Sequence, residues 1–291
     1  MASVKDLRDR IRSLKNTQQI TKAMKQVAAA KIRRAETAQK QARPYAETLS
    51  EMLNDLIASV NSVDHPFMKP GAQGAPSGVI LMTADKGLAG AFNSNVIRAG
   101  ELYAREHAGA VFYSVGVKAR NAVRRLGQAD RPAWALNVES KIDAARDVAQ
   151  RVTDDFVAGK ISDITLVSSK MLSMMSQKPQ TQHLVPIVAE EIKGSAAGQS
   201  SGPKNAVEFS PSPEFVLSRL LPKYLEFTIF SAMLETDAAF FAAQLVAMNN
   251  ATDNAGKLID ELTIVMNNAR QAAITKELLE IVGGAEALTG K

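Results

Sequence analysis

Apolar residues recur every three or four positions from residue 4 to about residue 60. The spacing is 3, 4 and 3 in the first turns, which contain Val4, Leu7, Ile11 and Leu14. Because no glycine occurs before Gly71, this periodicity predicts one very long helix or two helices in series. Pro44 falls within it, so we expect a kink or a join there. After a slip near Gln18, the stripe is expected to resume at Ile20, Met24, Val27, Ile32, Ala35, Ala42, Leu49, Met52, Leu53, Leu56 and Val60.

The last part of the chain carries a longer heptad pattern. Ser212 offers an N-cap and Pro213 a first helical residue, so we expect a helix from there to about residue 286. At 1.5 Å per residue this helix would be roughly 110 Å long. One seam position recurs at Tyr224, Ser231, Ala238, Leu245, Thr252, Ile259, Met266 and Ala273. The other recurs at Phe227, Leu234, Phe241, Met248, Ala255, Leu262 and Ala269. Such a sustained seam is typical of a coiled coil.

The end of this helix, NNARQAAITKELLEIVGGAEAL, has apolar residues on more than one side. One stripe contains Ile274, Leu278, Ile281 and Val282, whereas Leu279 faces away from it. A helix that is apolar most of the way round needs apolar surroundings.

Between the two long segments, short apolar runs alternate with helical ones. The runs at residues 78–83, 109–116 and 161–169 are rich in β-branched residues. Strands that alternate with helices predict right-handed crossovers and a mainly parallel sheet. Further strands are expected at residues 182–192 and 206–211, joined by a polar linker.

The two terminal helices need each other, because neither is stable alone in water. An antiparallel pair follows, with the middle domain inserted at one end. The predicted fold class combines α and α/β structure: a long antiparallel coiled coil of N- and C-terminal helices with an inserted Rossmann-like α/β domain. The expected boundaries are residues 1–62, 77–211 and 212–288, in that order.

Composition narrows the possible chemistry. The 291-residue chain has no cysteine, which excludes disulfides, thiolate nucleophiles and Cys-ligated zinc. His65, His107 and His183 are far apart, so we expect no metal site. No run of 18 uncharged apolar residues and no signal-peptide core are present, so we expect no membrane span and a location inside the cell.

Charge is unevenly distributed. Residues 1–43 contain 12 basic and 3 acidic residues, a balance of +9 within a whole chain of +5, so the remainder carries −4. A basic segment suits an acidic partner, which could be nucleic acid, an anionic lipid surface or an acidic protein surface. Nucleic acid is disfavoured because apolar residues interleave with the charges and no aromatic residue precedes Tyr45.

Two further motifs have both a chemical and a structural interpretation. TADKGLAGAFNSN, residues 83–95, follows a strand and opens a helix, where a Rossmann domain binds pyrophosphate. Its glycines do not give GxGxxG and no P-loop is present, so a structural turn is favoured over an anion site, and a dehydrogenase or NTPase is disfavoured. Met171, Met174 and Met175 suit core filling, which is favoured, or a partner surface.

Three motifs together resemble the γ subunit of F-type ATP synthase, bacterial type. They are LRDRIRSLKNTQQITKAMKQVAAAKIRRAE, MNNATDNAGKLIDELTIVMNNARQAAITKELLEIVGGAEAL and TADKGLAGAFNSN, the last being similar to that family's turn DRGLCGGLN. Ala89 stands where many members carry cysteine, and the cysteine-bearing insertion of plastid members is missing. Thiol control is therefore not expected.

The resemblance implies a central-stalk rotor subunit of the F1Fo ATP synthase, a rotary motor that couples hydrogen ion transport to ATP synthesis or hydrolysis. In that family the coiled coil enters the α3β3 hexamer of F1, and the α/β domain binds the ε subunit and the c-subunit ring, with one copy per complex. The chain would be non-catalytic and would need no cofactor. It would bind no nucleic acid and would reach the membrane only through the complex. Met1 without a transit peptide favours the cytoplasmic side of the bacterial inner membrane over an organelle.

The resemblance also implies contacts with the hexamer. Arg270 and Gln271 match family residues that contact a β catch loop, and Met24 and Lys25 match a neighbouring amino-terminal contact site. Apolar tip residues are expected to turn inside the α3β3 sleeve: Ile274, Leu278, Ile281 and Val282. We also expect a basic face along the shaft that attracts acidic rims of the ring, formed by Arg8, Arg10 and Arg12.

Overall fold

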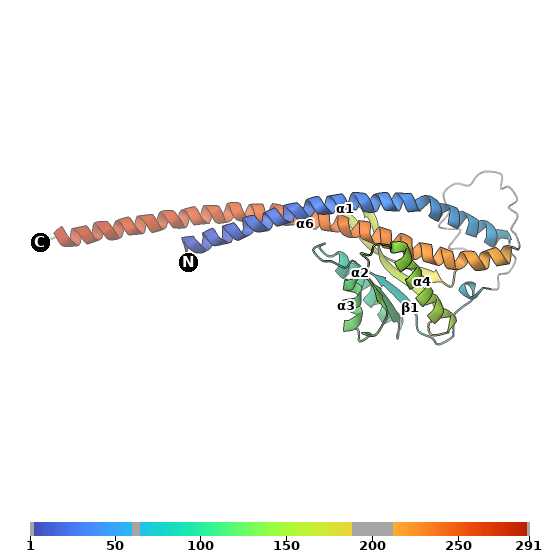
Figure 1. Cartoon of the computed structure of the whole chain (residues 1–291). Coiled ribbons are helices and arrows are strands. Elements are labelled where there is room, and N and C mark those ends of the chain that lie inside the picture. The colour runs from blue at the N-terminus through green and yellow to red at the C-terminus, as the bar shows by residue number, and fades with distance from the viewer. Residues whose placement is uncertain (1–2, 60–64, 188–211, 290–291) are drawn as a thin grey trace. The chain divides into compact units, whose positions relative to one another are not determined.

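The computed structural model describes residues 3–59, 65–187 and 212–289. Two helices are much longer than the others: α1 (Val4–Ser59) and α6 (Pro213–Thr289), blue and orange to red in Figure 1. The chain divides into two compact units, and each long helix contributes to both. The first unit comprises residues 1–28 and 245–291, and the second residues 29–244.

Polar side chains cap the first turns of both long helices. Ser212 Oγ accepts a hydrogen bond from the Phe215 N–H at 3.2 Å, which confirms it as the N-cap of α6. At the start of α1, Ser3 and Asp6 each donate a backbone N–H to the other's side chain at 3.1 Å, as in a capping box. α1 is continuous through Pro44, so the alternative of two helices in series is wrong.

A five-stranded sheet lies at the centre of the second unit, in the order β3-β2-β1-β4-β5. Its strands are β1 (Gly78–Met82), β2 (Val111–Val115), β3 (Ala133–Trp134), β4 (Ile164–Ser173) and β5 (Ser176–Val185). Among the strands that the structure describes, only the β4–β5 pair is antiparallel, which confirms the mainly parallel sheet. The strand expected at 182–192 starts earlier, as the second arm of a hairpin with β4. Its last residues and the strand expected at 206–211 lie outside the described residues.

Helices cover both faces of the sheet. Val79 and Leu81 of β1 pack with α2 (Phe92–Glu106) and α3 (Val117–Arg125). The alternate residues Ile80 and Met82 belong to the larger core, which includes residues of α4 (Lys141–Val157) and α6. Because both faces are covered, β1 and β2 are buried along their whole length.

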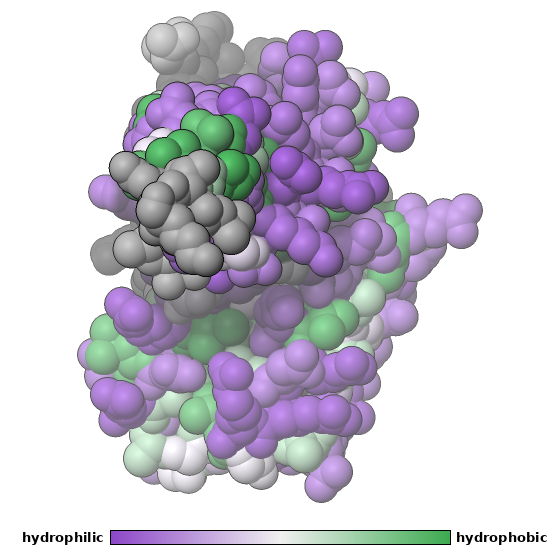
Figure 2. Space-filling view, turned by 90° about the vertical axis from the view of Figure 1, so that its left-hand side faces the viewer, coloured by the Kyte–Doolittle hydropathy of each residue, from purple (hydrophilic) through white to green (hydrophobic). Residues whose placement is uncertain are grey.

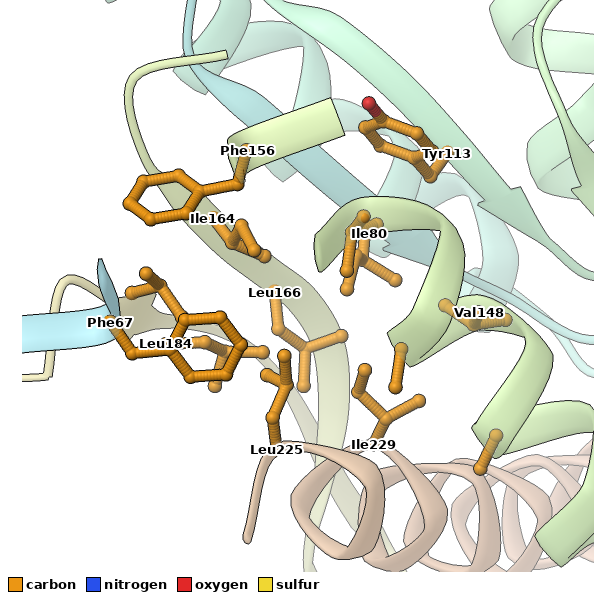
Figure 3. Packing of buried hydrophobic residues seen from close by; sticks show 14 of the residues in the cluster. Phe67, Ile80, Tyr113, Val148, Phe156, Ile164, Leu166, Leu184, Leu225 and Ile229 are labelled. Carbon is orange, nitrogen blue, oxygen red and sulfur yellow. The ribbon is translucent and has the colours of Figure 1, made fainter. Parts of the chain in front are cut away.

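Figure 3 shows part of the larger core, where side chains from the sheet, α4 and α6 meet. Leu225 and Ile229 of α6 lie close to Leu166 of β4, and Phe67 of the short 3-10 helix η1 (Pro66–Met68) closes one side. In this unit the second half of α1 also packs against α6, since the rings of Tyr45 and Phe227 are 4.7 Å apart.

One buried carboxylate ties β2 to α4. Asp155 accepts hydrogen bonds from the Tyr113 hydroxyl at 2.9 Å, from Arg151 at 3.1 Å and from Lys160 at 3.0 Å. Burial alone would raise the pKa of Asp155, but the hydrogen bonds from Lys160 and Tyr113 and the charge of Arg151 together lower it. Burial and the neighbouring Asp155 raise the pKa of Tyr113, which stays a hydrogen-bond donor.

The turn between β4 and β5 is exposed. Met171 packs partly against the core, but Met174 is exposed and Met175 is 81% exposed. Core filling, favoured from the sequence, is therefore wrong for Met174 and Met175.

In the first unit, the start of α1 packs antiparallel against the second half of α6. The heptad seam of α6 is buried at Met248, Ala255 and Ile259, and its positions up to Ala269 are half-buried or buried. The buried residues of α1 in this unit are Leu7, Ile11, Thr21 and Ala28. The antiparallel coiled coil expected from the sequence is thus confirmed.

The slip predicted in α1 near Gln18 is wrong. The seam continues with its regular spacing through Leu14, Gln18, Thr21, Lys25 and Ala28, all of which are buried or half-buried. Ile20 and Val27, expected in the seam, are instead 60% and 55% exposed. The regular 3,4 spacing keeps these polar residues inward, and the apolar residues between them point outward.

By length and composition alone, one window of 18 residues within α6 could cross a membrane, but 61% of that window is buried inside the protein. This burial is the pattern of a core helix.

Candidate functional site

The end of α6 has no helix beside it in the described part of the chain. Lys25 contacts Asn249 and Thr21 contacts Thr252, and this antiparallel register, continued to the start of α1, sets Val4 opposite about residue 269. Residues 270–289 of α6 therefore extend past the start of α1 by about 30 Å. Every described side chain from Arg270 to Ala285 is exposed. Figure 2, viewed from this end, shows hydrophobic surface bordered by polar surface.

The four apolar tip residues predicted from the sequence lie on one stripe of this free segment, and all are exposed. The exposed fractions are 49% for Ile274, 57% for Leu278, 66% for Ile281 and 59% for Val282. Leu279 is 67% exposed on another side, so the tip is apolar around much of its circumference, as expected. Large exposed apolar surface of this kind marks a site of interaction.

Arg270 and Gln271 begin the free segment, and both are exposed. Met24 and Lys25 are half-buried and lie near residue 249 of α6, because Lys25 Nζ bonds to Asn249. At 1.5 Å per residue, this level is about 30 Å from Arg270 along α6. The structure therefore does not bring the two predicted contact sites together, and each would meet a partner at a different height of the coil.

Arg8, Arg10 and Arg12 are all exposed. Arg8 and Arg12 are one turn apart and share a side of α1, whereas Arg10 lies on the other side of the seam that contains Leu7 and Ile11. The three residues thus flank the seam on both sides instead of forming one face. Asp6 precedes these arginines in α1. Hydrogen bonds from Ser3, and to a smaller extent the charge of Arg10, lower the pKa of Asp6.

Several exposed apolar residues of the coil were missed as candidates for partner contact. They are Ile20, Val27, Leu258, Ile264 and Val265. The heptad register could have identified those on α1. Counted from Leu7 and Ile11, it continues without a break through polar positions, so Ile20, Met24 and Val27 fall outside the seam and form a second stripe.

The turn at residues 83–95 is filled by its own side chains. Asp85 accepts hydrogen bonds from the backbone N–H groups of Val117 at 2.9 Å, Leu136 at 3.3 Å and Asn137 at 2.6 Å. Asn93 accepts one from Ala84 N–H and donates one to Lys86 O, both at 3.0 Å. Asp85 therefore ties the turn to the start of α3 and to residues 136–137, and Asn93 ties it to the start of α2, so these polar side chains have a structural role in the turn.

Within the described residues, no group of three or more His, Asp or Glu side chains could hold a metal ion. The exposed apolar residues make the coil of the first unit a candidate surface for protein contact, which comprises the tip, Ile20 and Val27 of α1 and the flanking cations.

The fold is shared with solved ATP synthase structures. A chain from the Euglena gracilis mitochondrial ATP synthase, in a structure of OSCP, F1 and c-ring, superposes with a TM-score of 0.67 at 19% identity, over 99% of this chain and 95% of that one. A chain from the central stalk and c-ring of the Tetrahymena thermophila enzyme gives a TM-score of 0.59 at 21% identity, over 80% and 99%. At these identities the likeness shows the fold, and it confirms the coiled coil with an inserted α/β region.

Sequence relatives are closer. The ATP synthase gamma chain of Heliobacterium modesticaldum is 41% identical, covering 99% of this chain and all of the relative. That of Pelotomaculum thermopropionicum is 43% identical over the same shares. A family profile described as ATP synthase matches residues 3–288. The chain therefore belongs to the ATP synthase gamma chain family.

Proposed function

We propose that the chain is the central-stalk rotor of an F1Fo ATP synthase, which turns inside an α3β3 hexamer and couples proton flow through a c-subunit ring to ATP synthesis or hydrolysis. One observation carries the proposal: a chain that matches ATP synthase gamma chains over its full length has an apolar helix end whose side chains are exposed from Arg270 to Ala285, over about 24 Å. This end needs apolar surroundings, and none of the described residues supplies them.

The chemistry of the tip suits a rotating contact. Apolar contact is non-directional and scales with the area removed from water, so Ile274, Leu278, Ile281 and Val282 can be covered at many angles with similar free energy. Arg270 differs, because a guanidinium binds carboxylates with a fixed fork geometry. With Gln271 beside it, Arg270 would sense particular angles of the hexamer at a β catch loop.

A second contact level surrounds Met24. The exposed apolar residues Ile20 and Val27 extend this level along α1. The cations Arg8, Arg10 and Arg12 would add attraction to acidic rims of the ring from both sides of the seam. Lys25 is also implied as a contact by the family resemblance, but its ammonium bonds to Asn249 in this structure.

The α/β domain of the second unit would carry the other contacts, to the ε subunit and the c ring. The catalytic sites would belong to the hexamer, and this chain would act without a cofactor. Such a subunit is associated with the membrane through its complex, and bacterial relatives favour the cytoplasmic side of the inner membrane.

Single-molecule rotation tests the proposal. Because the chain has no cysteine, Arg124→Cys on the exposed side of α3 gives one attachment point for a bead. The chain is assembled with an α3β3 hexamer from the same organism, and the hexamer is fixed to a surface. ATP should then drive rotation of the bead in 120° steps, as the threefold symmetry of the hexamer requires. Saturable assembly without any rotation under ATP would overturn the rotor assignment.

A further inference from the structure

The ammonium of Lys25 is held inside the coil of the first unit. Lys25 Nζ donates a hydrogen bond to Asn249 Oδ1 at 2.5 Å, and Asn249 Nδ2 donates one to Asp253 Oδ2 at 3.0 Å. Lys25 and Asn249 are half-buried, whereas Asp253 is exposed. The Asn249 amide thus bridges the Lys25 ammonium to the Asp253 carboxylate. A 180° flip of this amide would exchange its oxygen, which accepts, and its nitrogen, which donates, so both hydrogen bonds would be lost.

Other polar groups brace the same level. Thr252 Oγ1 donates to Thr21 Oγ1 at 2.8 Å, and Thr21 is buried. Gln18 Nε2 donates to Thr252 O at 3.5 Å, the longest bond of the set. Gly256 leaves room for this amide, because a Cβ there would lie 3.1 Å from Gln18 Nε2. Lys25 thus lies next to a polar layer that joins the two helices, and its ammonium bonds to Asn249 there.

The outer side of α1 at this level is apolar. Ile20 and Val27 are exposed, and Met24 directly precedes Lys25. Lys22 is exposed but lies two residues before Met24, on the far side of the helix. If the flexible Lys25 side chain left Asn249, its ammonium would therefore be the cation beside Met24. A hydrogen bond that involves an ionised donor is stronger than a neutral one, so the Asn249 bond favours retention.

We propose that Asn249 and Asp253 are positioning residues that keep the Lys25 ammonium inside the coil, so that the surface around Met24 meets its partner without that charge. The retention of Lys25 depends on this chain alone. Its consequence for partner contact rests on the proposed function. The proposal replaces the direct partner contact that family resemblance implies for Lys25.

Amine labelling of the full chain tests retention. Lys22 is the internal reference because it is exposed two residues away. In quantitative mass spectrometry, Lys25 should react about tenfold more slowly than Lys22, as expected for an ammonium held by a charged hydrogen bond. Asn249→Ala should bring the Lys25 rate close to that of Lys22, whereas Asn250→Ala, at the exposed neighbouring position, should leave it unchanged. Equal rates for Lys22 and Lys25 in the unsubstituted chain would overturn the proposal.

Rotation of the reconstituted complex tests the consequence. Asn249→Ala should slow ATP-driven rotation or lower its torque because it frees a cation beside Met24. Adding Lys25→Gln to that variant removes the charge and should restore rotation toward the level of the unsubstituted chain. A purely structural loss, or a direct role for Lys25, would make the double variant no better than Asn249→Ala and would refute the proposal. Failure of the unsubstituted chain to rotate would reject the rotor assignment instead, while the labelling result would still decide retention.

Discussion

Replacing two residues of the α6 tip by glutamine separates folding from assembly. Leu278 and Ile281 are 57% and 66% exposed, so they contribute little to the fold of the chain by itself. We expect Leu278→Gln/Ile281→Gln to change the free energy of unfolding by less than about 0.5 kcal/mol, as at other exposed positions. The melting temperature followed by circular dichroism should move by no more than about 2 °C.

Assembly with α3β3 should respond much more strongly. Complete burial of a Leu or Ile side chain stabilises by about 1.5–3 kcal/mol. Somewhat more than half of each side chain remains to be covered, so each should add about 1–2 kcal/mol inside an apolar sleeve. The double variant should therefore lose about 2–4 kcal/mol of binding free energy, which is roughly a 30- to 1,000-fold weaker Kd. Titration of a fluorescently labelled chain with the hexamer measures this change.

A seam substitution provides the matched control. Ile259 is 8% exposed in the same helix, so Ile259→Gln should lower the melting temperature because it buries an amide in the seam. The tip variant should show the reverse signature, with normal melting and weak assembly. A threefold change in Kd corresponds to only about 0.7 kcal/mol of binding free energy. If the tip variant melts normally and its Kd for the hexamer stays within about threefold of that of the unsubstituted chain, the tip is not buried in an apolar sleeve.

Three further substitutions test other parts of the molecule. Arg270→Ala should leave the melting temperature unchanged but lower proton-driven ATP synthesis several-fold in membrane vesicles; full synthesis by an intact complex would remove this residue from the contact surface. Replacing the flanking arginines Arg8, Arg10 and Arg12 by glutamine should slow assembly with the hexamer most at low salt, because salt screens the attraction between charges. If this variant and the unsubstituted chain assemble at equal rates at all salt concentrations, electrostatic attraction by these arginines is excluded. Asp155→Asn should destabilise by about 1–3 kcal/mol at pH 7, where the carboxylate is ionised. Because folding lowers the pKa of Asp155, its stabilisation is present above the ordinary value near 4 and is lost as pH falls through the lower folded value, so urea midpoints of the two chains should converge in acid.

The sequence predicts α6 well because the same seam is repeated along it. Positions such as Leu245, Met248 and Ile259 are apolar at heptad spacing, and one or two exceptions do not obscure the pattern. The exposed tip is predicted for the same reason, since the helix pattern continues where no second helix is long enough to cover it. Length alone therefore identifies the most distinctive part of the candidate site.

Apolar periodicity does not predict the seam of α1 correctly, because polar residues face inward and apolar residues face outward in part of this helix. Ile20, Met24 and Val27 have the spacing of a seam, but Leu14 and Ala28 fix the inward side of a continuous helix. This leaves Ile20 and Val27 on the outer side and Met24 half-buried between the two sides. Composition cannot show that Thr21 and Lys25 point inward, because their partners are more than two hundred residues away in the sequence.

Strand β5 was placed too late for a related reason. Its sequence, SQKPQTQHLV, has few apolar residues, because most of the strand is half-buried or exposed and it is the outermost of the described strands. The role of Asp85 was also not predictable, since the N–H groups that it binds belong to the first residue of α3 and to two adjacent residues after β3, all more than thirty residues away. Both features depend on contacts between distant segments, which periodicity does not record.

The inverted pattern of the first unit has a consequence for stability. Its seam contains polar or small residues such as Gln18, Thr21 and Ala255 beside apolar ones such as Ile11 and Ile259, and Ile20 and Val27 face outward. Apolar burial therefore contributes less to holding these two helix segments together than it does in the second unit. The second unit differs, because Leu53, Leu217 and the sheet share one large core. Local stability follows buried apolar contact, so the coil of the first unit should open more readily in the free chain than the second unit unfolds. A partner that covers Ile20, Val27 and the tip would supply the missing burial, and assembly would then stabilise the segment that has to transmit torque.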